Sequence, residues 1–191
     1  RGPDGVAGRG TVGALNVPTR VRVAQIRLNL ERARWVLHAI QGRRVLVDVA
    51  GFRLHYFDGD RDWTTRVVVG RPYRKTPIFR STLQYLVINP TWTVPPGILA
   101  KDILPAVKRD PGYLAKKGLE VIDADGRPVT APIDWASMTP SKFRYQLRQG
   151  PGPDNALGRV KFMFPNPYSV YLHDTPSKAL FEKSARAFSS G

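Results

Sequence analysis

Residues 169–191 read SVYLHDTPSKALFEKSARAFSSG. Val170 and Leu172 alternate with Tyr171 and His173, a period of two that predicts a short strand ending at the histidine. A polar turn, a helix-like segment and a Ser-Ser-Gly tripeptide follow. A histidine at a strand end, followed by a turn of small residues, looks like half of a catalytic site.

Upstream of this stretch, further alternating segments predict more of a sheet. Three runs, at 45–49, 52–56 and 65–69, are joined by short turns and predict antiparallel strands. Strand character returns at 78–89 and again at 160–164. His55 lies out of phase with the apolar set of its strand, so we expect it to be exposed and structural rather than catalytic. The fold class predicted is mainly β with α elements.

The segment between these later strands has a different character. NPTWTVPPGIL, residues 89–99, contains three prolines, which exclude a central strand beyond Pro90. Helices are predicted at 98–109 and 113–117, and a hairpin with its turn at 124–126. Because alternation resumes at Val160, residues of about 90–150 are predicted to form an insertion between strands of one sheet, and long insertions of this kind are usually lids or binding elements.

The clearest predicted helix is at 19–41, where Val23, Ile26 and Leu30 lie on one stripe. Thr19 is its expected N-cap and Gly42 its expected stop. Five arginines occupy its other faces. They are compatible with DNA binding, but a solvated face on a helix docked to a core is the preferred interpretation.

The composition narrows the possible functions. With 42% hydrophobic and 10% aromatic residues the chain can build a packed core, and the excess of 30 Lys and Arg over 15 Asp and Glu favours polyanionic partners. No run of about 18 apolar residues predicts a membrane span, and the first residues lack the apolar segment of a signal peptide. There is no cysteine, and the three histidines are far apart, so neither a disulfide nor a metal site is expected.

Several of these motifs together resemble the L,D-transpeptidases with a YkuD-type catalytic domain, in particular their large periplasmic branch. The matching segments are HDT at 173–175, SSG at 189–191, PTWTVPP at 90–96, GRVKFMFPNP at 158–167 and RVAQIRLNLERARW at 22–35. The resemblance implies a β-rich catalytic domain at 43–191 with an inserted α+β capping subdomain, preceded by a linker helix at 18–42. Residues 1–17 are similar to the end of a peptidoglycan-binding domain.

The resemblance also implies the site. His173 would be the base, with its far ring nitrogen held by the backbone carbonyl of Asp174 and the Asp174 side chain in a lesser role. The family places a cysteine nucleophile directly after SSG, so Gly191 would supply an oxyanion-hole N–H beside it. Substrate-facing candidates are Tyr171, Trp92, Ser189 and Ser190. Tyr171 could equally well simply pack, whereas a buried anchor for the insertion is slightly preferred for Trp92, and a plain turn residue is preferred for Ser190.

The implied substrates are peptidoglycan tetrapeptide stems, as acyl donor and acceptor, joined by 3→3 cross-links in the periplasm or cell envelope. Carbapenems would acylate the intact enzyme, no cofactor or metal is needed, and membrane attachment would require an anchor outside this chain. We expect the 191 residues to be a truncated piece of such an enzyme, inactive alone, with an uncovered sheet edge and poor solubility. The alternatives are a non-catalytic wall-binding or scaffold protein and, less favoured because no DNA- or RNA-binding motif is present, a basic nucleic-acid-binding module.

Overall fold

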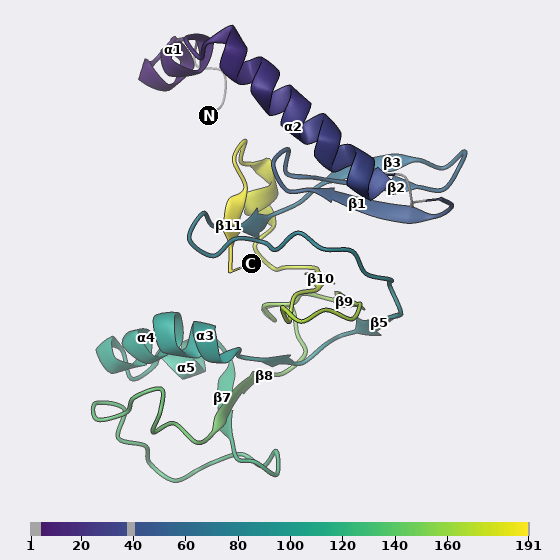
Figure 1. Cartoon of the computed structure of the whole chain (residues 1–191). Coiled ribbons are helices and arrows are strands. Elements are labelled where there is room, and N and C mark those ends of the chain that lie inside the picture. Colours follow the sequence, from purple (N-terminus) through teal and green to yellow (C-terminus); the bar gives the residue numbers. More distant parts are fainter. Residues whose placement is uncertain (1–4, 38–40, 191) are drawn as a thin grey trace. The chain divides into compact units, whose positions relative to one another are not determined.

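The computed structural model describes residues 5–37 and 41–190 (Figure 1). The chain divides into two compact units. The first comprises Arg1–Arg74 with Ala179–Ser189, and the second comprises Lys75–Lys178 with Ser190–Gly191. Strands outnumber helices in both, which confirms the mainly β class with α elements. None of the helices within the described ranges has the length and apolar character needed to cross a membrane.

Two helices begin the first unit, α1 (Arg9–Leu15) and α2 (Thr19–Leu37). α2 confirms the predicted helix, although residues 38–40 of that prediction lie outside the described residues. Thr19 is its first helical residue rather than its cap, because the Pro18 carbonyl already accepts from the N–H groups of residues 21 and 22. Gly42 has a φ of 71°, which suits a helix stop.

The apolar stripe of α2 does not dock on a core as we expected. Val23, Ile26 and Leu30 keep 40%, 58% and 57% of their surface exposed. Arginines at positions 22, 27 and 34 border this stripe and keep it narrow, so it offers little continuous apolar surface to bury.

The strands of the first unit follow the predicted order. β1 (Arg44–Asp48), β2 (Arg53–Phe57) and β3 (Trp63–Arg66) form an antiparallel sheet in the order β1-β2-β3. The predicted run at 65–69 is divided, because β3 ends at Arg66 and β4 (Val69–Gly70) pairs in parallel with β11 (Ala187–Ser189). His55 is structural, as expected, but half-buried rather than exposed: its Nδ1 lies 3.0 Å from the Thr64 hydroxyl and its ring stacks on Phe57.

The second unit contains the sheet that carries His173. β5 (Tyr85–Ile88), β9 (Val160–Met163) and β10 (Leu172–His173) are antiparallel, in the order β10-β9-β5. The predicted strand at 78–89 is reduced to β5. Ile78 is 85% exposed, and Ser81 donates its hydroxyl hydrogen to the Pro165 carbonyl, so this stretch runs as irregular chain.

β5 and β9 are neighbours although residues 89–159 separate them in sequence. This excursion forms a sheet of its own, β6-β8-β7, from β6 (Trp92–Thr93), β7 (Leu119–Ile122) and β8 (Gln146–Gln149). Helical turns α3 (Pro96–Ile98), η1 (Leu99–Ile103), α4 (Leu104–Arg109) and α5 (Tyr113–Lys116) confirm the two predicted helices. The π turn η1 precedes Pro105, which has no N–H to donate to a carbonyl four residues back.

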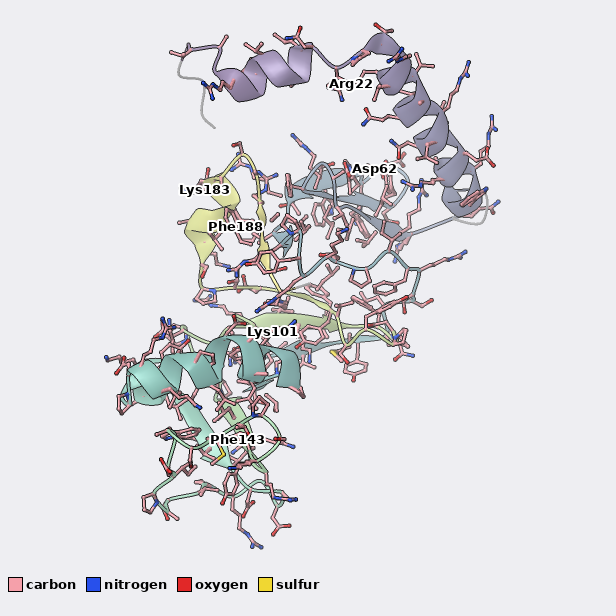
Figure 2. All side chains as sticks on the ribbon, turned by 60° about the vertical axis from the view of Figure 1, so that its left-hand side comes forward. Arg22, Asp62, Lys101, Phe143, Lys183 and Phe188 are labelled. Carbon is pink, nitrogen blue, oxygen red and sulfur yellow. The ribbon has the colours of Figure 1, made fainter. Side chains whose placement is uncertain are left out.

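The sheet and helices of the excursion enclose a core of their own. Phe143, labelled in Figure 2, belongs to this buried cluster, whose other members are Val94, Ile103, Val107, Leu119 and Leu147. The predicted hairpin turn is present, since the Asp123 carbonyl accepts from Gly126 N–H. Its second arm is joined to β7 by the Ile122–Pro128 bridge and by hydrogen bonds from Val129 N–H to the Val121 carbonyl and from Asp123 N–H to the Arg127 carbonyl, but Pro128 cannot donate and no regular strand forms there. β7 also pairs with β8.

Candidate active site

His173 is the last residue of β10, and its backbone neighbour fixes the state of its ring. Nδ1 lies 2.5 Å from the carbonyl oxygen of Asp174. A carbonyl can only accept, so Nδ1 carries the hydrogen and donates it. In the neutral ring the other nitrogen, Nε2, then holds the free lone pair, which makes it the atom able to take a proton. The hydrogen bond to the Asp174 backbone is the one that the sequence led us to expect.

The surroundings of His173 favour the neutral form of its ring. Burial of the ring lowers its pKa below the ordinary value of 6.5, and the positive charge of Lys161 lowers it further, against the opposing effect of Asp174. Lys161 is the antiparallel partner of His173 on β9. Part of the residue stays open to solvent, as a base that must reach a substrate requires.

Asp174 is held on both its backbone and its side chain. Its N–H donates to the Val160 carbonyl at 2.9 Å, and one carboxylate oxygen accepts from Arg159 N–H at 3.1 Å. The other carboxylate oxygen pairs with the Lys178 ammonium. Burial raises the pKa of Asp174, but the bonds from Lys178 and the backbone outweigh it and bring the pKa to about 2. The residue therefore stays ionised and presents its carbonyl to His173 in a fixed direction.

Gly158 is required where the excursion returns to the sheet. Its φ is +61°, and a Cβ built there would lie 2.5 Å from the Asp174 Oδ2 atom. Only glycine leaves room for the carboxylate in this conformation. The preceding loop is fixed by Asn155, which is 1% exposed and donates to the carbonyls of Pro90 and Gly150.

A pocket of about 490 Å³ opens beside Asp174 within the second unit. It has two cationic and two acidic side chains on its walls, so it is suited to a polar group rather than an apolar one. The lining residues are Pro153, Asp154, Gly158, Arg159, Asp174, Thr175, Pro176 and Lys178.

The remaining predicted site residues have separate places in the fold. Tyr171 lies beside His173, with ring centroids 5.8 Å apart at 63°. Trp92 is on β6 and packs, half-buried, against the core of the excursion. Ser189 is in β11 of the first unit, and Ser190 follows it in the second. Gly191 lies outside the described residues.

Sequence reasoning missed two contributors to the site. Lys161, between Val160 and Phe162, resembled an ordinary polar position of an alternating strand, and only the register shows that it faces His173. Gly158 could have been found from the turn-rich QGPGPDNALG segment, but its clash partner Asp174 could not. Within residues 5–37 and 41–190, no group of three or more His, Asp or Glu side chains is placed to hold a metal ion.

Comparison with known proteins identifies the family to which this chain belongs. Residues 42–191 match the profile of the YkuD family, described as the L,D-transpeptidase catalytic domain. The chain is also 38% identical over 169 residues to a Haemophilus influenzae protein named "Putative L,D-transpeptidase", a match that covers 87% of this chain and 34% of that protein. The chain thus spans about a third of the curated relative that it matches. With its catalytic-domain match extending from residue 42 to residue 191, this chain belongs to the YkuD family of L,D-transpeptidase catalytic domains.

Proposed function

We propose that the chain is the catalytic part of a periplasmic L,D-transpeptidase that forms 3→3 cross-links between peptidoglycan tetrapeptide stems. The observation that carries this proposal is the hydrogen bond from His173 Nδ1 to the Asp174 carbonyl, because it leaves Nε2 as an unprotonated base. Family membership supplies the reaction class. The net charge of +15 suits a polymer rich in carboxylates.

The first half-reaction is an acyl transfer to sulfur. The nucleophile is the cysteine that the family motif places directly after Gly191, and His173 Nε2 takes its proton. The thiolate attacks the carbonyl of the amide that precedes the terminal D-Ala, and a C–S bond forms. The amide C–N bond then breaks, and the imidazolium returns its proton to the departing amine, so D-Ala leaves with its nitrogen protonated and a thioester remains.

The second half-reaction transfers the acyl group to an amine. The side-chain amine of the diamino acid in a neighbouring stem attacks the thioester carbonyl, and His173 accepts the proton that this amine loses. The C–S bond breaks, the thiolate is restored, and the new amide is the 3→3 cross-link. A neutral His173 suits both steps, because each begins with proton removal.

The other candidate residues receive roles in this scheme. Tyr171, beside His173, lines the acyl-donor pocket, and the N–H of Gly191 with that of the next residue forms the oxyanion hole, next to Ser189 and Ser190. Trp92 anchors the capping subdomain formed by residues of about 90–150. α2 (Thr19–Leu37) is the helix of a linker at 18–42, and residues 1–17 belong to the tail of a peptidoglycan-binding domain.

The test uses a protein in which a cysteine follows Gly191. Incubation with a carbapenem is expected to add one acyl group by intact mass, and incubation with disaccharide-tetrapeptides to yield a cross-linked dimer with loss of D-Ala. A cysteine-to-alanine variant should give neither product. His173→Ala should slow both reactions by about a hundredfold or more, the usual contribution of a general base.

A folded, cysteine-containing protein that gives no adduct and no dimer would contradict the proposal. If that protein still binds purified peptidoglycan, the non-catalytic wall-binding alternative replaces it.

A further inference from the structure

We propose that Lys161 is a substrate-binding residue that recognises a carboxylate next to the scissile amide of the donor peptide. The inference rests on the proposed function for the identity of the substrate. Its structural basis is a single cluster of three side chains, Lys161, Tyr171 and His173, on one face of the β10-β9-β5 sheet.

The positions of the three side chains follow from strand register and ring contacts. Lys161 on β9 is paired directly with His173 on β10. Tyr171 and His173 are two residues apart along the chain, so their side chains project to the same face. The Lys161 ammonium lies 3.8 Å from the centroid of the Tyr171 ring, which in turn meets the His173 ring edge-on at 5.8 Å. The ammonium is thus held beside the proposed base.

The charge of Lys161 has no acidic counterpart in the part of the chain that is described. The nearby carboxylate, that of Asp174, is engaged by the Lys178 ammonium and by Arg159 N–H. Lys161 is half-buried, and burial lowers its pKa. A partly desolvated cation that rests only on an aromatic ring gains more from an incoming carboxylate than a fully hydrated surface lysine does.

The proposed substrate supplies such groups close to the reacting carbonyl. The terminal D-Ala carries a carboxylate one residue beyond the scissile amide, and the diamino acid carries another on its side chain. Either could reach the ammonium while the amide lies near Nε2. The contact with Tyr171 restrains the flexible lysine, which reduces the entropy lost on binding.

The 191-residue chain itself allows a direct binding test, because it contains no cysteine and any signal is binding alone. The affinity of a soluble stem tetrapeptide is measured by NMR titration at a protein concentration at which light scattering shows a monomer. Lys161→Met keeps the apolar stem and removes the charge, and is expected to weaken binding by about tenfold to a hundredfold, the range for loss of a charge-assisted hydrogen bond. Lys161→Arg should retain most of the affinity.

Two chemical variants of the peptide identify the carboxylate. One has the terminal D-Ala amidated, and the other has the side-chain carboxylate of the diamino acid amidated. The peptide that lacks the recognised group should bind wild type and Lys161→Met equally weakly. The matched control is Lys142→Met, the same change of charge at an exposed position of the same unit, which should leave every affinity unchanged.

The inference is overturned if Lys161→Met binds the unmodified peptide as tightly as wild type does, or if it loses the same factor for all three peptides. Because this measurement does not require turnover, it separates failure of the Lys161 assignment from failure of the transpeptidase proposal. In the cysteine-containing protein, the same substitution should raise KM for the unmodified donor without a comparable effect on the amidated one.

Discussion

Replacing Gly158 by alanine tests whether Asp174 is held by the returning loop. The substitution is expected to lower the free energy of unfolding for two separate reasons. The first is a left-handed backbone, φ +61°, which disfavours any residue with a Cβ by about 1 kcal/mol. The second is steric, because the new methyl group would lie 2.5 Å from Oδ2 and 2.6 Å from Cγ of Asp174.

The steric cost follows from what Asp174 must give up when it moves. Its carboxylate would lose the 3.1 Å bond from Arg159 N–H, and a hydrogen bond to a charged group is worth about 2 kcal/mol. The ion pair with Lys178 adds little, because the lysine side chain is 64% exposed and its charge is well screened. We therefore expect Gly158→Ala to lower the free energy of unfolding by about 3 kcal/mol in total.

Gly118→Ala is the matched control. Gly118 has a φ of +58° in the same unit, and nothing lies within 4 Å of the Cβ built there, so only the backbone cost of about 1 kcal/mol applies. The assay is urea unfolding at low protein concentration, followed by the fluorescence of Trp92 and Trp135, with Trp35 and Trp63 replaced by phenylalanine in every variant. Equal destabilisation by the two alanines would refute the close approach of Gly158 to Asp174.

Four further results are expected. NMR titration of the ring in the 191-residue chain should give His173 a pKa below 6.5, because burial disfavours the charged ring. Lys161→Met should raise this pKa, and a pKa that does not change would contradict the role of the lysine charge. Asp174→Asn should lower the free energy of unfolding by about 1 kcal/mol at neutral pH. The ionised carboxylate stabilises the fold above its unfolded pKa of 3.8, so the difference between the variants should vanish as the pH falls through the folded pKa of about 2. A difference in urea unfolding that does not depend on pH would exclude the ionic explanation. Arg186→Met should destabilise the first unit by about 3 kcal/mol, since the buried guanidinium donates to the carbonyls of Phe52, Val67 and Lys183. Amide hydrogen exchange in β4 and β11 should then accelerate, and Arg186→Lys should recover part of the lost stability. The isolated chain should self-associate as its concentration rises, since β5 has one neighbouring strand and exposes Leu86 and Ile88 by 51% and 68%; a monomer with a sharp melt by light scattering and calorimetry would contradict this.

Strands with period-two alternation could be predicted, because the alternation of apolar and polar residues requires only that one face of the strand is buried. β1, β2 and β9 were located from their valines, leucines and phenylalanines alone. β5 was predicted too long, because Ile78 has strand propensity but lies beside no partner strand, and propensity without pairing does not make a strand. The hairpin arm at 127–129 does lie beside β7, but Pro128 has no N–H to donate, so the arm forms an isolated bridge rather than a strand.

Side-chain neighbours across strands could not be read from local pattern. The stripe of α2 has helical spacing whether or not anything covers it, so its exposure had to come from the structure. Likewise, Lys161 faces His173 because of the register in which β9 and β10 pair, and a shift of one residue would have placed Phe162 there instead. The family resemblance implied the contact of His173 with the Asp174 carbonyl, but not the neighbouring cation that lowers the pKa of His173.

The two ends of the excursion, residues 89–159, are connected by a series of hydrogen bonds to His173, the proposed catalytic base. Asn89 N–H donates to the Arg159 carbonyl, and the buried Asn155 donates to the carbonyl of Pro90, so the entry and exit of residues 89–159 are tied together. Arg159 N–H in turn binds the Asp174 carboxylate, and the Asp174 carbonyl orients His173. A substitution at Asn155 should therefore disturb the imidazole without touching it, because the bond of Asn155 to the Pro90 carbonyl is buried and its loss leaves that carbonyl without a partner among the described residues, which loosens the chain segment that carries Arg159.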